Sequence, residues 1–272
     1  MKKYNLLFLL RTVYGRAYPR IFGTIRNPSW IFFEILLPVL SIIAFIYVLR
    51  GFNAKPEFES FAVIGGSMMA IWFNVVFGMA LQLRWEKEGG NLEIYITSPT
   101  KLSWILLGMM FGGGLATTLY AISVFSISSY LFGTTFLWSN WYKAILIFIS
   151  CLISLYAVGM SLSSVFLRFG RSFEYYLELA NEPIHLLSGS YFPIFSVNII
   201  FGLFSSLIPI TLGIDALRQV LVISDYPAFI DWRIETLIMI IYSIISLRIA
   251  KFTLSWMEKA AREEGTLTLK WQ

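Results

Sequence analysis

Long apolar runs constrain this chain more than any other feature of its sequence. Six of them have at least the roughly 17 residues that a helix needs to cross a bilayer: 30–49, 61–83, 102–132, 144–167, 172–189 and 232–250. They are apolar on all sides, which excludes the alternating pattern of a transmembrane barrel. Because 57% of the residues are apolar and only 14% are charged, soluble enzyme folds are excluded as well. We therefore expect an all-α polytopic membrane protein with six transmembrane helices.

Basic residues predict the orientation of these spans. Six spans place both termini on one side, and Lys and Arg concentrate on the cytoplasmic side of membrane proteins. Residues 1–29 contain six of them, 84–101 three, 168–171 two and 248–272 five, which together are 16 of the 21 in the chain. We expect a multi-pass protein of the cell membrane with both termini in the cytoplasm. The same bias accounts for the net charge of +5, so no nucleic-acid partner is needed.

The segments that flank the spans divide the chain into three expected parts. In residues 1–29, apolar side chains recur at helical spacing from Tyr14 to Ile25 among four arginines, which predicts an amphipathic helix along the inner leaflet. A plain basic anchor is the alternative, and it leaves the apolar stripe unexplained. We expect residues 30–250 to form the transmembrane domain and residues 251–272 a cytoplasmic tail.

The cytoplasmic connection at residues 84–101 reads RWEKEGGNLEIYITSPTK. Its Gly-Gly break, short amphipathic stretch and Ser-Pro stop predict a short interfacial helix between two breaks. Such a helix suits docking into a groove of a soluble partner. An ordinary solvated loop explains the spacing equally well.

The connection before the last span is apolar but interrupted. Gly189, Pro193, Gly202, Pro209 and Gly213 divide it, and it carries no charge before Asp215. A lipid-facing helix does not run easily through two prolines, so we expect short re-entrant helices on the external side at residues 190–213. Counting this region as a full span would place the C-terminus outside, against the charge bias.

Together these two connections resemble the type-2 ABC exporter permease family. Members carry a loop of the form E-x-E-x-G-x-x-E, then Ser-Pro or Thr-Pro, then Leu-Leu-Gly. The matching residues here are Glu86, Glu88, Gly90, Glu93, Ser98, Pro99, Leu106, Leu107 and Gly108. Members also carry a small-Gly-x-aromatic-Pro turn, an Asn-Pro-Leu-Thr, and an Asp/Glu-Ala-Leu-Arg. Those positions are Ser188, Gly189, Tyr191, Phe192, Pro193, Ile208, Pro209, Ile210, Thr211, Asp215, Ala216, Leu217 and Arg218, with Ile208 in place of the usual Asn.

The resemblance implies the transmembrane permease subunit of an ATP-binding cassette exporter, closer to drug and lipid exporters than to polysaccharide exporters. The residues that would dock on a separate ATPase subunit are Glu86, Glu88, Gly89, Gly90, Glu93, Ser98 and Pro99. ATP and Mg would be bound by that subunit, and the sequence agrees, because it contains no Gly-Lys pair and hence no phosphate-binding loop. We expect no catalytic residue and no cofactor in this chain. The implied partners are the ATPase subunit, a second permease copy that is identical or related, membrane lipid, and a small-molecule or lipid substrate.

Four ionisable residues inside the spans are candidates for the translocation path, because charge within a membrane is costly and often functional. Glu34 lies four residues after Trp30, where lining of the path and snorkelling to the headgroups are equally consistent. Glu178, Glu182 and His185 share one face of the fifth span. Glu178 also fits an ion pair with Arg168 or Arg171, as does Glu174, while Glu182 and His185 favour the path.

Three other interpretations of these residues remain. Glu182 and His185 have the spacing of a di-iron ligand pair, but the chain lacks the second histidine that such a centre needs, so we expect no metal. A membrane-embedded lipid-modifying enzyme could use Glu178, Glu182 and His185 as acid, base or metal-binding groups. A non-catalytic membrane scaffold is the third.

Overall fold

The computed structural model describes residues 6–169, 172–222, 228 and 230–263, and these form helices and no strand. The first half contains α1 (Leu6–Ile25), α2 (Pro28–Gly51), α3 (Glu57–Trp72), the π-helical η1 (Phe73–Phe77), α4 (Gly78–Ala80), α5 (Gln82–Glu88), α6 (Asn91–Thr97) and α7 (Leu102–Phe132). The second half contains the 3-10 turn η2 (Trp138–Asn140), α8 (Trp141–Phe169), α9 (Ser172–Leu187), α10 (Ile194–Val197), α11 (Ile199–Ser205), α12 (Pro209–Leu221) and α13 (Trp232–Glu263).

The expected fold class, an all-α polytopic membrane protein, is confirmed. Among the described residues, five helical segments are long and apolar enough to cross a membrane: Pro28–Gly51, Glu57–Ala80, Leu102–Phe132, Trp138–Ser164 and Trp232–Trp256. The segment expected as the fifth span is α9, which has 16 residues and is not among these five. A sixth span is reached only if α11 and α12, which meet at a bend of 117°, are counted as one.

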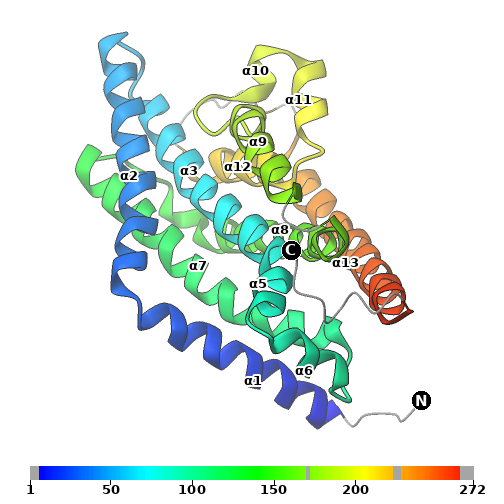
Figure 1. The fold of residues 1–272 in the computed structure, drawn as a ribbon. Coiled ribbons are helices and arrows are strands. Elements are labelled where there is room, and N and C mark those ends of the chain that lie inside the picture. Colours follow the sequence, from blue (N-terminus) through cyan, green and yellow to red (C-terminus); the bar gives the residue numbers. More distant parts are fainter. Residues whose placement is uncertain (1–5, 170–171, 223–227, 229, 264–272) are drawn as a thin grey trace.

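The short helices gather at the two ends of the helical bundle (Figure 1). At one end, α1 lies across the bundle next to α6. At the other end, α10, α11 and α12 lie close to one end of α9. The most extensive helix contacts are those of α8 with α13 and of α1 with α7.

The contact between α1 and α7 depends on two glycines in α7. A Cβ atom on Gly108 would lie 2.7 Å from the carbonyl oxygen of Val13, and one on Gly112 would lie 2.6 Å from that of Ala17. No side chain fits at either position without moving the α1 backbone. Small residues at a spacing of four therefore let the N-terminal helix approach the third predicted span at backbone distance.

Hydroxyl groups join α8 to α13. Ser154 lies within hydrogen-bond distance of Ser243, with 2.7 Å between the two Oγ atoms, and also donates to the carbonyl of Met239 at 2.8 Å. Ser161 donates to the carbonyl of Ser246 at 3.2 Å. Polar contacts of this kind hold apolar helices together where lipid offers no hydrophobic driving force.

Candidate functional site

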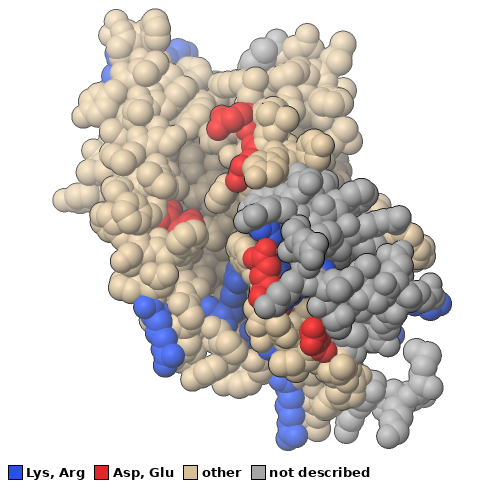
Figure 2. Space-filling view, viewed as in Figure 1, with Lys and Arg blue, Asp and Glu red and all other residues tan. Residues whose placement is uncertain are grey.

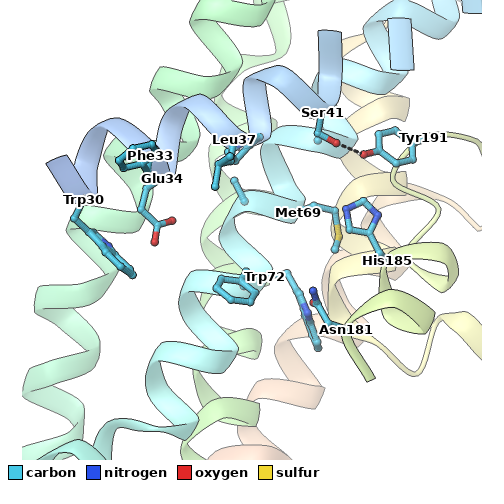
Figure 3. Close-up of a pocket in the computed structure, with 14 residues that line it drawn as sticks. Trp30, Phe33, Glu34, Leu37, Ser41, Met69, Trp72, Asn181, His185 and Tyr191 are labelled. Carbon is cyan, nitrogen blue, oxygen red and sulfur yellow. Dashed lines mark hydrogen bonds between the residues drawn. The ribbon is translucent and has the colours of Figure 1, made fainter. Parts of the chain in front are cut away.

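A cavity of about 390 Å³ opens between α2, the end of α3, and α9. Its lining is mainly aromatic and aliphatic, and Figure 3 shows side chains from these elements turned toward one space. The lining residues are Trp30, Phe33, Glu34, Leu37, Pro38, Ser41, Gly66, Met69, Ala70, Trp72, Phe73, Asn181, His185 and Tyr191. In the space-filling view this face is hollowed between α2 and α9, with acidic side chains beside the hollow (Figure 2).

Glu34 accepts a hydrogen bond from the side chain of Asn74. Asn74 lies in η1, a π-helical stretch of five residues, and such bulges occur often at functional sites. Asn74 was not among the residues predicted from the sequence. Its signal was visible, because Asn74 is the one strongly polar side chain in the run from Met68 to Leu81. This hydrogen bond between a carboxylate and a neutral amide joins α2 to η1.

A second cavity, of about 580 Å³, adjoins the first. Trp30, Glu34 and Phe73 line both, so the carboxylate lies at their junction. The second cavity extends to Arg20 of α1, which donates to Gln82 of α5 at 2.7 Å. Burial lowers the pKa of Arg20 from its ordinary value. The two cavities together form a continuous hollow from α1 toward α9.

The predicted path residues of α9 do not line one common cavity. His185 lines the first cavity, half-buried, with its Nδ1 3.2 Å from Ser190 Oγ and its ring stacked on Tyr191. Glu178 lines the second cavity, and Glu182 is exposed and lines neither. The expected pairing of Glu174 and Glu178 with Arg168 and Arg171 falls outside the described side chains.

The turn after α9 is held by one buried arginine. Arg218 of α12 is 1% exposed and donates to the carbonyls of Gly189, Ser190, Phe192 and Phe61, at 2.5 to 3.2 Å. Gly189 has a φ of +64°, which favours glycine. A Cβ on Gly65 would fall 1.6 Å from the Ser190 oxygen, so α3 touches this turn directly.

The other residues predicted for this region take supporting positions. Pro193 precedes α10, and Pro209 begins α12, where proline fits the first turn of a helix. Asp215 is buried and accepts a hydrogen bond from Gln219 at 3.0 Å, and Gln219 also donates to Glu235 of α13. The region is therefore joined to both α3 and α13.

Residues 82–97 form two short helices at a sharp turn. Gly90, with a φ of +74°, separates α5 from α6. Helix α6 is capped at its C-terminal end by Ser98, just before Pro99, and the Oγ of Ser98 accepts a hydrogen bond from the backbone N–H of Thr100. The predicted amphipathic helix is present, with Leu92 and Tyr95 buried against the protein and Glu93 and Ile94 exposed.

Glu86 is the centre of the hydrogen bonds that fix this turn. It accepts from Tyr95 at 2.7 Å, from Gln82 at 2.8 Å and from Asn91 at 3.0 Å. Burial and the bond to Glu86 raise the pKa of Tyr95, so its phenol stays protonated and donates. Arg16 of α1 donates to the same phenol at 3.0 Å, with its guanidinium over the ring.

The remaining acid of the turn, Glu88, pairs within its own helix. Its carboxylate accepts from Arg84 at 2.8 Å across one helical turn. Glu93 lies in the first turn of α6 and is exposed. The three acids of the sequence motif thus have three different surroundings, and only Glu86 connects separate helices.

Comparison with known protein families gives one match. Residues 20–222, about three quarters of the chain, match the model of the ABC-2 type transporter family. A comparison with curated proteins found no match. The matched range includes the first cavity, all of the second except Pro19, the α5–α6 turn and α12.

Proposed function

Since the chain belongs to the ABC-2 type transporter family and is thus a permease component of an ABC transporter, we propose that it is the membrane subunit of an exporter. A separate ATPase subunit drives it by docking on the α5–α6 turn, and a second permease copy completes the complex. The observation that carries this proposal is the free face of α6. It offers an apolar side chain, Ile94 at 61% exposure, next to the acidic Glu93.

The proposed docking face is suited to a protein partner because its opposite face is fixed. Leu92 and Tyr95 are buried, and Tyr95 is tied to Glu86 and Arg16. A rigid short helix with one apolar residue and one acid exposed fits the groove-binding mode of amphipathic helices. We place this end of the molecule, with α1, in the cytoplasm, where the basic residues concentrate.

We propose that a movement of α6 is transmitted to the hollow through a nearly continuous run of helix. Residues 57–88 run nearly uninterrupted through α3, η1, α4 and α5, and η1 carries Asn74, the partner of Glu34. Closure of two ATPase subunits around ATP would move α6. This movement would tilt the helical column formed by residues 57–88 and change the shape of the hollow at Glu34. Such coupling requires that substrate and nucleotide bind the two shapes with different affinity.

The second copy would face α2. Only 17% of the apolar window of this helix is buried within the described chain, and Phe32 and Leu37 are both more than half exposed. Lipid or another permease copy must cover this face in a membrane. A second copy there would enclose the hollow that α2 borders.

A membrane enzyme is the less supported alternative. It requires Glu178, Glu182 and His185 to converge, yet these residues line different cavities or none. Among the described residues, no group of three or more His, Cys, Asp or Glu could hold a metal ion. The family is one of membrane subunits that are not themselves catalytic.

Ile94→Asp tests the docking of the ATPase. Burying an Ile side chain contributes roughly 1.5–3 kcal/mol, so replacing it with a charge is expected to lower the yield of co-purified ATPase at least tenfold. The measurement is affinity purification in mild detergent, with mass spectrometry and an ATPase assay. Glu57→Gln, an exposed acid at the start of α3, is the control and should retain the partner. Recovery of a stoichiometric ATPase with the Ile94→Asp protein would refute docking at α6.

A further inference from the structure

The first cavity has a charge and a lining that select one class of ligand. Its 14 lining residues include one carboxylate, Glu34, and none of those residues is Lys or Arg. The partner that the structure gives to Glu34 is the neutral amide of Asn74, so no Lys or Arg of this lining pairs with the carboxylate. A carboxylate so placed within a span attracts a cation more strongly than one in water.

Aromatic faces surround the same carboxylate. Trp30, Phe33 and Phe73 are 46–56% exposed and line the cavity with Glu34, and Tyr191 closes it on the far side. The negative faces of aromatic rings attract organic cations, and tryptophan does so most strongly. Figure 3 shows Trp30 and Phe33 beside Glu34 on the same stretch of α2.

The size of the cavity limits the ligand further. A volume of about 390 Å³ lies in the range of pockets that take drug-sized molecules, roughly 300–1,000 Å³. Leu37, Pro38 and Met69 supply the apolar part of the wall. A hydrated metal ion would leave this wall without a partner, whereas a molecule with several rings or a short alkyl body would cover it.

The other charged residues of the hollow, Arg20 and Glu178, line the second cavity but not the first. Arg20 is hydrogen-bonded to Gln82. An anion would therefore be favoured near Arg20 and a cation near Glu34. The aromatic residues Trp30 and Phe33 lie on the Glu34 side.

We infer that the first cavity binds amphipathic organic cations, with the cationic centre at Glu34 and the apolar body among Trp30, Phe33 and Phe73. This inference names the substrate class of the exporter proposed above and rests on that proposal for its physiological meaning. The binding itself requires neither ATP nor the ATPase subunit. It is therefore testable separately from transport.

The test compares two ions of nearly equal shape and opposite charge. The full-length protein in lipid nanodiscs is incubated with radiolabelled tetraphenylphosphonium, and binding to empty nanodiscs is subtracted. Radiolabelled tetraphenylborate is measured in separate samples, and we expect saturable binding of the cation only. No saturable binding of the cation, or equal saturable binding of the anion, would overturn the inference.

Variants locate the site. Glu34→Gln keeps a hydrogen-bonding partner for Asn74 but removes the charge, and we expect at least a tenfold loss of affinity for tetraphenylphosphonium. Glu34→Asp, which restores the charge, should recover most of it, and Trp30→Leu should weaken binding several-fold. Glu57→Gln should bind as the unaltered protein does. Unchanged affinity of Glu34→Gln would overturn the site assignment.

Two results separate this inference from the proposed function. Ile94→Asp is expected to lose the ATPase partner but to bind the cation normally. If Ile94→Asp keeps its partner while cation binding still depends on Glu34, the docking proposal fails and the ligand class stands. If the ATPase is lost as expected but Glu34→Gln binds the cation unchanged, the ligand class fails and the docking proposal stands.

Discussion

A single side chain, Arg218, joins three parts of the molecule. It reaches from α12 to the turn at residues 189–192 and to the carbonyl of Phe61 in α3. A planar guanidinium with donors in a fixed fork suits several carbonyls at once, which the point charge of a lysine does not. These bonds lie beside the apolar cluster that α3 and α12 share.

Replacing Arg218 with Met should destabilise the protein strongly. Four carbonyls lose a charged donor, and each buried unsatisfied polar group costs roughly 1–3 kcal/mol. We expect a loss of roughly 3 kcal/mol or more in the free energy of unfolding, measured by thermal unfolding in detergent. Arg218→Lys should recover part of this loss. The control is Arg233→Met at an exposed position of α13, and an equal loss there would contradict the specific role of Arg218.

At the scale of helices, two glycines in α7 determine how closely α1 packs on it. Gly108 and Gly112 let α1 approach α7 so closely that the Cβ atoms of Arg16 and Arg20 would lie 2.8 and 2.9 Å from a Cβ added at the glycines. The same approach allows Arg16 to reach Tyr95 and Arg20 to reach Gln82. The position of α1 therefore determines both the contact with the α5–α6 turn, through Arg16, and the position of Arg20 in the second cavity.

Gly112→Leu should separate these helices. The added side chain meets the backbone of Ala17, which cannot rotate away, and overpacking of this kind costs roughly 1–3 kcal/mol. We expect a lower unfolding temperature and faster proteolysis within α1. Gly15→Ala is the matched control, because a Cβ there meets nothing within 4 Å and should leave stability unchanged or raised by up to about 1 kcal/mol. Equal stability of both variants would show that α1 is not packed through Gly112.

At the scale of the whole molecule, the proposed docking turn and the hollow are connected by two routes. One is the column of residues 57–88, and the other passes from Tyr95 through Arg16 to α1 and α7. The second route contains a single phenol that donates to Glu86 and accepts from Arg16. Removing that hydroxyl tests whether a movement of α6 is transmitted.

Tyr95→Phe should uncouple ATP hydrolysis from transport. Hydrogen bonds to charged groups contribute roughly 1.5–3 kcal/mol, so we expect the amount of substrate moved per ATP to fall by roughly tenfold. The partner ATPase should still bind, because the exposed face of α6 is unchanged. Transport and phosphate release are measured together in proteoliposomes, with Tyr14→Phe on the exposed face of α1 as the control. An unaltered transport-to-ATP ratio would count against the route through Tyr95.

Much of the fold could be predicted because the relevant signals are local. Hydropathy identified α2, α7 and α8 close to their observed bounds, and Gly90 and Pro99 marked the turn after α5 and the break before α7. It identified the start of α13, but that helix continues to Glu263, beyond the predicted end of the span at residue 250. The fifth predicted span, at residues 172–189, is not among the long apolar helices of the described chain. The acidic α9 has 16 residues, while the apolar residues beside it divide between two helices at a 117° bend.

The sequence by itself determined the class of protein, five of the six predicted apolar spans and the positions of the two motif-bearing turns. These depend on composition and on residues near one another in the chain, through the cost of placing polar backbone in lipid. Only the tertiary structure decided which distant groups meet: Asn74 with Glu34, Arg218 with the turn at 189–192, and α1 with Gly108 and Gly112. Such pairs lie tens of residues apart, and helix packing selects them, because the local pattern allows many partners and close packing allows one.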